Sequence, residues 1–270
     1  MSVRSLVGCC ALFLLVGVST LPLPRSAEAQ SRKRGEIKTK VNPIDGATAV
    51  WVTPAKFTMG AGADLHEVTL TRPYWLYQVP VTNAQYRKFV KATGYQPEPA
   101  HWSNPAFSAD LQPVVGVAHK DAVAYCKWAG GRLPTEAEWE WAARGPEGGK
   151  FPWGNADATE KLAVYKAEDG SGPQHPEPVG SRPDGMSWCG ALDMAGNVTQ
   201  WCQDWYIPQR RGEAAIDPLI AEKVDAEVRV IRGGSWVHSI ALARSFYRSL
   251  LPPDATTDTN GFRVVLDASR

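Results

Sequence analysis

A long stretch without regular periodicity, residues 146–229, limits most strongly what this chain can fold into. It is rich in Gly, Pro, Asp and Trp, and neither the two-residue period of a strand nor the 3.6-residue period of a helix is sustained in it. Glycine, proline and aspartate favour turns and loops. We therefore expect most of the stretch to be loops packed through aromatic rings, and the 11 tryptophans of the chain supply such rings.

Short runs of β-branched and aromatic residues predict strands on both sides of this stretch. Pro54 separates the first two of them, because proline interrupts the hydrogen-bond ladder of a sheet. The expected strands lie at residues 50–52, 56–59, 67–71, 74–81, 228–231 and 262–266.

Three helices are marked by signals at their ends. The first has Thr82 as a suitable N-cap and Gly94 as a suitable left-handed residue at its end. The second is expected over residues 120–129. The third is marked best, because Thr135 and Glu138 form a capping box at its start.

The first thirty residues have the organisation of an export signal. Arg4 precedes an apolar run over residues 6–18, and Ala27-Glu28-Ala29 is a small-residue cleavage site. A lipoprotein box ending at Cys9 is the alternative, but only five residues precede that box, too few for an apolar core. We expect a periplasmic or secreted protein that has no membrane contact after signal cleavage. Its parts would be a signal peptide at 1–29, a polar linker at 30–48 and one domain at 49–270.

Cleavage would leave three cysteines, Cys126, Cys189 and Cys202, in an oxidising compartment. Cys189 and Cys202 flank one compact loop that contains glycine. We therefore expect a disulfide between these two, and a buried thiol at Cys126.

Charge and histidine spacing narrow the possible partners. The formal net charge is +1, which does not favour nucleic acid as a partner. The five histidines are scattered, so a zinc or non-haem iron site would need ligands from distant loops. The expected partner is an exported protein or a secreted small-molecule substrate, and the sequence does not define the oligomeric state.

Six motifs occur in a fixed order along the chain. They are residues 130–140 (GGRLPTEAEWE), 151–155 (FPWGN), 193–198 (DMAGNV), 201–206 (WCQDWY), 232–236 (RGGSW) and 261–265 (GFRVV). In this order they resemble the formylglycine-generating enzyme, or sulfatase-modifying factor, family, and the match covers about residues 50–267. The resemblance implies an α+β domain of the formylglycine-generating-enzyme fold, related to C-type lectins and poor in regular secondary structure.

The resemblance also implies a copper chemistry whose ligands are missing here. Members that make formylglycine oxidise a cysteine of a sulfatase, and they use a copper(I) ion that is held by two cysteines between the GGS turn and the following arginines. Copper(I) prefers soft thiolates, which histidine and serine do not replace. The interval from Trp236 to Arg248 contains no cysteine, and Ser245 stands about where the second thiolate would be. Copper-dependent formylglycine generation is therefore not expected.

A different set of residues on the same loop could carry chemistry. His238 stands two residues after the end of the GGSW turn, in the part of the fold that forms the active cleft of enzymes that this chain resembles, and could act as a general acid or base near neutral pH. Arg244 and Tyr247 could donate to an oxyanion, and Ser245 completes the candidate catalytic set. The alternative is that His238 is a surface histidine on a variable loop.

The loop from Asp193 to Gln200 resembles the family's calcium loop. Carried over by position, the ligands would be the side chains of Asp193 and Gln200 and the carbonyls of Gly196 and Val198. Calcium takes six to eight oxygens with some carboxylate charge, and Gln200 is neutral where the family usually has glutamate. The resemblance implies a weakened structural calcium site, and the alternative is a turn held by aromatic packing and hydrogen bonds.

Three functions remain open from the sequence. The first is an exported maturation enzyme with an oxidoreductase-like modification reaction, because some relatives without the cysteine pair resemble maturation factors, including one implicated in periplasmic oxidation of a siderophore chromophore. The second is a non-catalytic, lectin-like binding module or accessory protein. The third, a true formylglycine-generating enzyme, is disfavoured by the missing thiolates. The sequence does not decide whether the protein is an enzyme.

Overall fold

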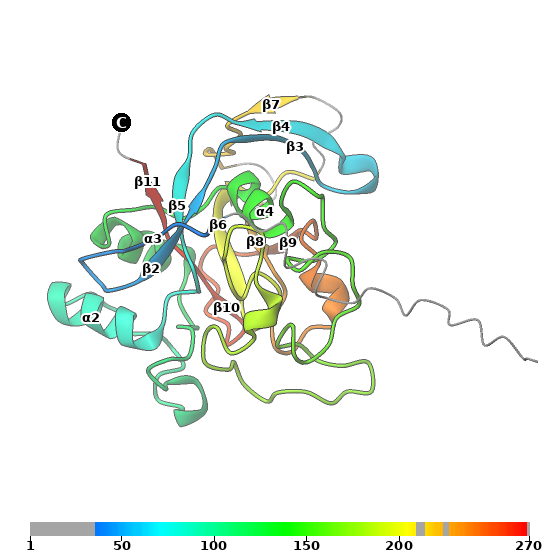
Figure 1. Ribbon diagram of the computed structural model, residues 1–270. Helices are drawn as coiled ribbons and strands as arrows, with labels where there is room; N and C mark the ends of the chain where they lie inside the picture. The colour runs from blue at the N-terminus through cyan, green and yellow to red at the C-terminus, as the bar shows by residue number, and fades with distance from the viewer. Residues whose placement is uncertain (1–35, 209–213, 224–226, 269–270) are drawn as a thin grey trace, which may run out of the picture. The chain divides into compact units, whose positions relative to one another are not determined.

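The computed structural model describes residues 36–208, 214–223 and 227–268. The expected signal peptide at 1–29 lies outside the described residues. Within these ranges the chain combines short strands, three α-helices and long connections, which confirms the α+β, loop-rich fold class (Figure 1). No helix in the described ranges has the length and apolar character needed to cross a membrane.

The strands form three small sheets. The strands are β1 (Thr39–Val41), β2 (Thr48–Val52), β3 (Ala55–Met59), β4 (His66–Leu70), β5 (Tyr74–Tyr77), β6 (Thr199–Trp205), β7 (Ala215–Ile216), β8 (Arg229–Arg232), β9 (Ser249–Leu251), β10 (Asn260–Gly261) and β11 (Val265–Asp267). Their orders are β1-β2-β5-β11, β10-β6-β8-β9 and β3-β4-β7. Strand β11 from the end of the chain pairs antiparallel with β5, so the two ends of the domain meet in the first sheet (Figure 1).

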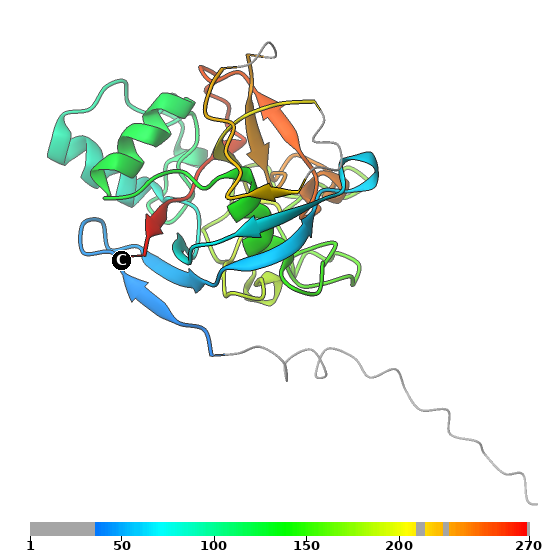
Figure 2. The same cartoon turned by 90° about the horizontal axis from the view of Figure 1, so that it is seen from above.

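The three helices form where their end signals predict. They are α2 (Asn83–Thr93), α3 (His119–Trp128) and α4 (Glu136–Arg144). At the start of α4 the Glu138 backbone N–H donates to Thr135 Oγ1 at 3.2 Å, and the Thr135 N–H donates to Glu138 Oε2 at 2.8 Å. This reciprocal pair satisfies two of the N–H groups in the first turn of the helix. Helices α2 and α3 lie side by side (Figures 1 and 2).

The folded part of the chain begins earlier than expected, so the prediction of a linker over residues 30–48 is wrong for its second half. Strand β1 pairs with β2, and the turn between them is fixed by buried polar side chains. Asn42 donates to Tyr77 Oη at 2.5 Å, and Asp45 accepts hydrogen bonds from the hydroxyls of Tyr77 and Tyr125 at 2.8 and 2.5 Å. The linker was predicted because the segment is polar and lacks periodicity. Its polar side chains instead form hydrogen bonds to core tyrosines, and composition does not reveal such contacts.

Strand β6 lies inside the stretch expected to be mostly loops, and it forms the middle of the second sheet. Six of its seven residues are buried. A strand buried on both faces has no alternation of apolar and polar residues, and periodicity therefore does not reveal it. Its neighbour β8 leads directly into the candidate catalytic loop.

The expected disulfide between Cys189 and Cys202 does not form. All three cysteines within the described residues are free and buried. Cys126 packs in the apolar cluster around Tyr86, and Cys189 and Cys202 pack in a second cluster around Trp139. Cys189 Sγ lies 3.4 Å from Ser187 Oγ, so its polar neighbour is a hydroxyl. Flanking one loop in sequence does not bring the two sulfur atoms together, because both side chains serve as core residues.

Candidate functional site

The candidate catalytic loop, residues 233–248, connects the neighbouring antiparallel strands β8 and β9. It begins with two glycines whose φ angles are 98° and 66°, in the region that favours glycine. A Cβ atom on Gly233 would lie 3.1 Å from the Trp139 ring, and one on Gly234 would lie 3.0 Å from Cβ of Ala243. The turn is therefore packed closely on the core.

A buried guanidinium joins the end of the loop to α4. Arg232, which is fully buried, donates to the Tyr247 carbonyl at 2.6 Å and to the Ser245 carbonyl at 3.1 Å. It also forms an ion pair with the buried carboxylate of Glu140. Charge-assisted hydrogen bonds of this kind are strong and directional. Arg232 thus holds the last part of the candidate loop against the helix.

A second arginine and carboxylate pair holds the point where the loop enters β9. Arg248 donates through Nε to Glu136 Oε1 at 2.6 Å and through Nη2 to Glu136 Oε2 at 3.1 Å. Its Nη1 donates to the Ile207 carbonyl at 3.1 Å. Two carboxylates from one face of α4 therefore fix the loop through two arginines, and these charged side chains serve a structural role.

The loop holds Ser235 and His238 in contact. Ser235 Oγ lies 2.8 Å from His238 Nδ1, and the His238 backbone N–H donates to the Ser235 carbonyl at 3.0 Å. Ser235 is 1% exposed, and His238 is half-buried. Burial lowers the pKa of His238, so the ring is neutral at neutral pH. A neutral imidazole oriented by a hydroxyl has the geometry of a general base.

Ser235 is a residue that the sequence reasoning missed. Its signal is present in the chain, because it stands three residues before His238 in a turn that starts with two glycines. That spacing brings the two side chains together only in a tight turn, whose conformation the sequence does not specify by itself.

The other three predicted catalytic residues, Arg244, Ser245 and Tyr247, differ in how much of each side chain is exposed. Tyr247 is 37% exposed, and Arg244 is half-buried. The Arg244 Nε atom is buried and has no hydrogen-bond partner among the described residues. Ser245 is fully buried, and its hydroxyl likewise has no partner in the described part of the chain. Its backbone N–H donates to the Lys150 carbonyl at 2.8 Å.

The expectation that Ser245 belongs to the reactive set therefore needs correction. With no exposed surface, its hydroxyl does not reach a substrate in this conformation. Arg232 and the Lys150 carbonyl hold the backbone of this residue on both sides of its peptide units, in a position where its side chain is fully buried. Counting back from Arg248 gives its place along the chain but not the direction of its side chain.

The loop proposed for calcium is held together by its own hydrogen bonds. Gln200 Oε1 accepts from Trp139 Nε1 at 2.8 Å and from Arg263 Nε at 2.6 Å, and Gln200 Nε2 donates to the Asp193 carbonyl at 2.7 Å. Asp193 Oδ2 accepts from the Gly180 N–H at 2.7 Å. Both acceptor positions of the Gln200 amide oxygen are used, which leaves no lone pair for a metal ion.

A fixed positive charge already lies beside this loop. The fully buried Arg263 donates to the carbonyls of Tyr77, Leu192 and Asp193 at 2.8, 2.8 and 3.2 Å. Burial lowers the pKa of Arg263 to about 10, so it remains protonated at neutral pH. Burial also raises the pKa of Asp193. The residues Asp193, Gly196, Val198 and Gln200, as arranged, do not fit a calcium ion, which needs six to eight oxygens.

Metal-ligating side chains do not converge elsewhere in the described ranges. No group of three or more His, Cys, Asp or Glu residues there could hold a metal ion. His119, for example, is buried and contacts the Cys202 carbonyl through Nε2 at 3.1 Å, far from the other histidines in sequence.

The sequence is similar to a known protein family and to several characterised proteins. Residues 33–268 match the family model described as a sulfatase-modifying factor enzyme 1-like domain. The formylglycine-generating enzyme of Streptomyces coelicolor is 32% identical and aligns over 91% of each chain. The inactive C-alpha-formylglycine-generating enzyme 2 of Mus musculus is 31% identical, over 76% of this chain and 78% of that protein.

Two solved structures are similar in fold. PvdO from Pseudomonas aeruginosa superimposes with a TM-score of 0.68 at 28% identity, covering 86% of this chain and 98% of that one. Treponema denticola variable protein 1 superimposes with a TM-score of 0.71 at 22% identity, covering 86% of this chain and 99% of that one. The second similarity concerns the fold alone.

Proposed function

Because the chain belongs to the family of sulfatase-modifying factor enzyme 1-like domains, we propose that it is an exported factor that modifies a secreted protein or a secreted small molecule without a copper–thiolate centre. The hydrogen bond between Ser235 and His238 is the observation on which this proposal rests. In the proposed reaction His238 removes a proton from the substrate, and Ser235 fixes the orientation of the ring.

Two further groups support a reaction at this loop. Arg244 is half-buried and its side chain donates no hydrogen bond to any described residue, so the exposed part of its guanidinium has hydrogen bonds to give. Tyr247 is exposed beside it and can donate its hydroxyl. In the proposal these groups stabilise an oxyanion that forms when His238 takes a proton.

The cysteines support a reaction without copper. Cys126, Cys189 and Cys202 are at most 5% exposed, and burial raises the pKa of each thiol. A buried thiol with a raised pKa is a poor source of the thiolate that copper(I) requires. One relative, the mouse protein, carries the word inactive in its name as a formylglycine-generating enzyme.

The experiment compares the wild-type protein with two variants, and the substrates come from extracts of cells that lack the gene. Periplasmic protein and small-molecule fractions are incubated with the wild-type protein, with His238→Ala, or with Lys120→Ala, which changes an exposed residue of α3. The proposal expects the wild type and Lys120→Ala to produce the same mass change on one component, and His238→Ala to produce none. An unchanged yield with His238→Ala would contradict the proposal.

A non-catalytic binding module is the second candidate, and one observation favours it. Val237 and Tyr247 of the candidate loop are each 37% exposed, and in this second proposal these two side chains form the face that binds a partner. A binding module would retain a partner on this face and produce no mass change. Retention of one component by both wild type and His238→Ala, without modification, would favour this second function.

A further inference from the structure

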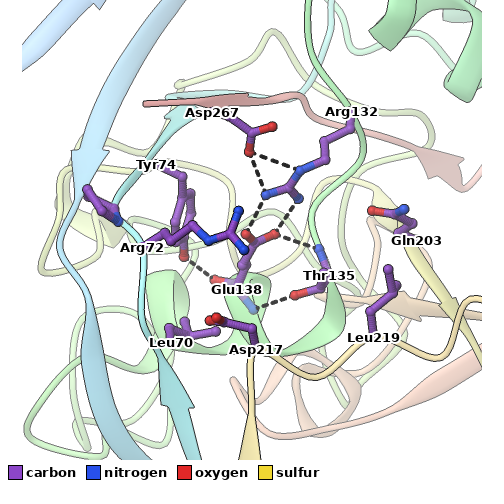
Figure 3. Close-up of a pocket in the computed structure, with 11 residues that line it drawn as sticks. Leu70, Arg72, Tyr74, Arg132, Thr135, Glu138, Gln203, Asp217, Leu219 and Asp267 are labelled. Carbon is purple, nitrogen blue, oxygen red and sulfur yellow. Dashed lines mark hydrogen bonds and ion pairs between the residues drawn. The ribbon is translucent and has the colours of Figure 1, made fainter. Parts of the chain in front are cut away.

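A cavity of about 230 Å³ has no residue of the candidate loop in its lining. Figure 3 shows the residues that line it. It opens between the β4–β5 connection, the start of α4 and the segment that follows β7. Its lining residues are Leu70, Arg72, Pro73, Tyr74, Arg132, Thr135, Glu138, Gln203, Asp217, Leu219 and Asp267. None of them belongs to residues 233–248, so the cavity is separate from the site proposed above.

One wall of the cavity is a fixed chain of charges. Arg132 donates to both oxygens of Glu138 at 2.7 Å and to Asp267 Oδ1 at 2.8 and 3.1 Å. Its Nη1 also donates to the Leu133 carbonyl at 3.2 Å. Glu138 is 8% exposed and its Oε2 also accepts from the Thr135 N–H. The donors of Arg132 are used, so this arginine has no hydrogen bond left for a ligand.

The second arginine of the cavity, Arg72, has no partner among the residues that the structure describes. Arg72 is exposed, and Figure 3 shows its guanidinium directed into the cavity with no interaction drawn to it. It has no hydrogen bond or ion pair with any residue in the described ranges. The nearby Asp217 does not pair with it, because both of its oxygens accept from Thr71, at 2.7 and 2.5 Å.

These facts restrict the chemistry of a ligand. The three carboxylates and two arginines give the cavity a net charge of −1, which disfavours a dianion such as phosphate. The guanidinium fork of Arg72 matches a single carboxylate. The outer oxygen of Asp267, whose side chain is 72% exposed, can accept from an N–H group of the ligand. Leu70, Pro73 and Leu219 supply an apolar wall beside these groups.

The volume also limits the ligand. Drug-sized ligands occupy pockets of roughly 300–1,000 Å³. A cavity of about 230 Å³ has room for a single amino-acid residue but not for a larger cofactor. We propose that this cavity binds an α-carboxylate next to an N–H group and an apolar side chain, as in a free apolar amino acid or the C-terminal residue of a peptide.

The test is calorimetric titration of the mature chain with leucine, with acetyl-Gly-Gly-Leu and with leucinamide, which lacks the carboxylate. We expect saturable binding of at least one of the first two, and at least about tenfold weaker binding of leucinamide. Binding of leucine alone identifies a free amino acid as the ligand, and binding of the peptide alone identifies a chain end. Both results support the proposal.

Three variants make the test specific. Arg72→Gln should weaken binding about tenfold or more, whereas Lys127→Gln, an exposed cation outside the cavity, should leave it unchanged. His238→Ala should also leave it unchanged, so failure here and failure of the proposed modification reaction are distinguishable. Absence of saturable binding at millimolar concentration, equal binding of leucinamide, or full binding by Arg72→Gln would overturn the inference.

Discussion

Ser235 Oγ and His238 Nδ1 are 2.8 Å apart, and the turn that contains both is closed by a backbone hydrogen bond between the same two residues. The hydroxyl and the imidazole are therefore held in contact by local structure. The turn itself is fixed from outside by the two glycines and by Arg232 and Arg248, which bind the carboxylates of α4.

The first prediction concerns this pair. His238→Ala should lower the rate of the modification reaction by about 10²–10⁴-fold, the usual contribution of a general base. Because His238 is half-buried and makes no ion pair with any described residue, its loss should leave the free energy of unfolding nearly unchanged. Steady-state rates and urea denaturation, measured on the same preparations, check both parts.

The pH profile of the rate separates a reactive His238 from a merely structural one. A base works in its neutral form, and the pKa of His238 is lowered by burial, so activity should persist at pH 6.5 and fall only at lower pH. Ser235→Ala removes the hydroxyl beside Nδ1 and should shift this acid limb. A profile that is identical in wild type and Ser235→Ala would argue against the pair.

The second prediction concerns Trp139 in the core. Its ring is fully buried, its Nε1 donates to Gln200, and the Arg232 guanidinium lies 5.3 Å from the ring centroid. Trp139→Ala should lower the free energy of unfolding by about 3–5 kcal/mol, because it leaves a cavity and removes one of the two hydrogen bonds that Gln200 Oε1 accepts. Urea denaturation measures the loss. Trp51→Ala, at a half-buried residue of β2, should cost clearly less, and equal losses would contradict the placement of Trp139.

The helices were predictable because their signals are local. A capping box needs only Thr135 and Glu138 three residues apart, and Gly94 ends α2 because its own φ angle is 66°. The order of the six motifs likewise predicted the family and its fold. The same reasoning failed for β6, because a strand buried on both faces lacks the alternation on which the method depends.

The site was only half predictable, because its geometry depends on contacts distant in sequence. His238 was found from its place after the GGSW turn. Whether Ser245 points inward depends on Arg232, 13 residues away, and on Lys150. The cysteines show the same limit, because the cores that enclose Cys189 and Cys202 are built from several distant segments.

The third prediction concerns calcium. Because Gln200 accepts two hydrogen bonds and Arg263 supplies positive charge beside the loop, EDTA and millimolar calcium should both leave the melting temperature of the wild type unchanged. Thermal unfolding followed by circular dichroism measures this. A melting temperature that falls with EDTA in the wild type, but not in Asp193→Asn, would show that the loop binds the ion.

The fourth prediction is a dependence of stability on pH. Burial, together with the positive charge of Arg229, lowers the pKa of His119 from 6.5 to about 4. The unfolded chain therefore binds the proton at a higher pH than the folded protein does. Stability is complete above pH 6.5 and falls as the pH drops from 6.5 toward 4, by roughly 3 kcal/mol from this residue.

His119→Gln isolates this effect, because glutamine is neutral at every pH and can still donate to the Cys202 carbonyl. The difference in unfolding free energy between wild type and variant should change between pH 7 and pH 4, in favour of the variant at the lower pH. A difference that stays constant across this range would contradict a buried neutral His119.

We infer that this chain keeps the family's scaffold without the copper–thiolate chemistry of its formylglycine-generating members. The test incubates the protein and copper(I) with a peptide that carries the sulfatase cysteine motif, and traps any aldehyde with a hydrazide. The Streptomyces coelicolor enzyme serves as the positive control. We expect aldehyde with the control and none with this protein, because Cys126, Cys189 and Cys202, the three cysteines of the described residues, are buried. Aldehyde formed by this protein in amounts comparable to the control would contradict the account.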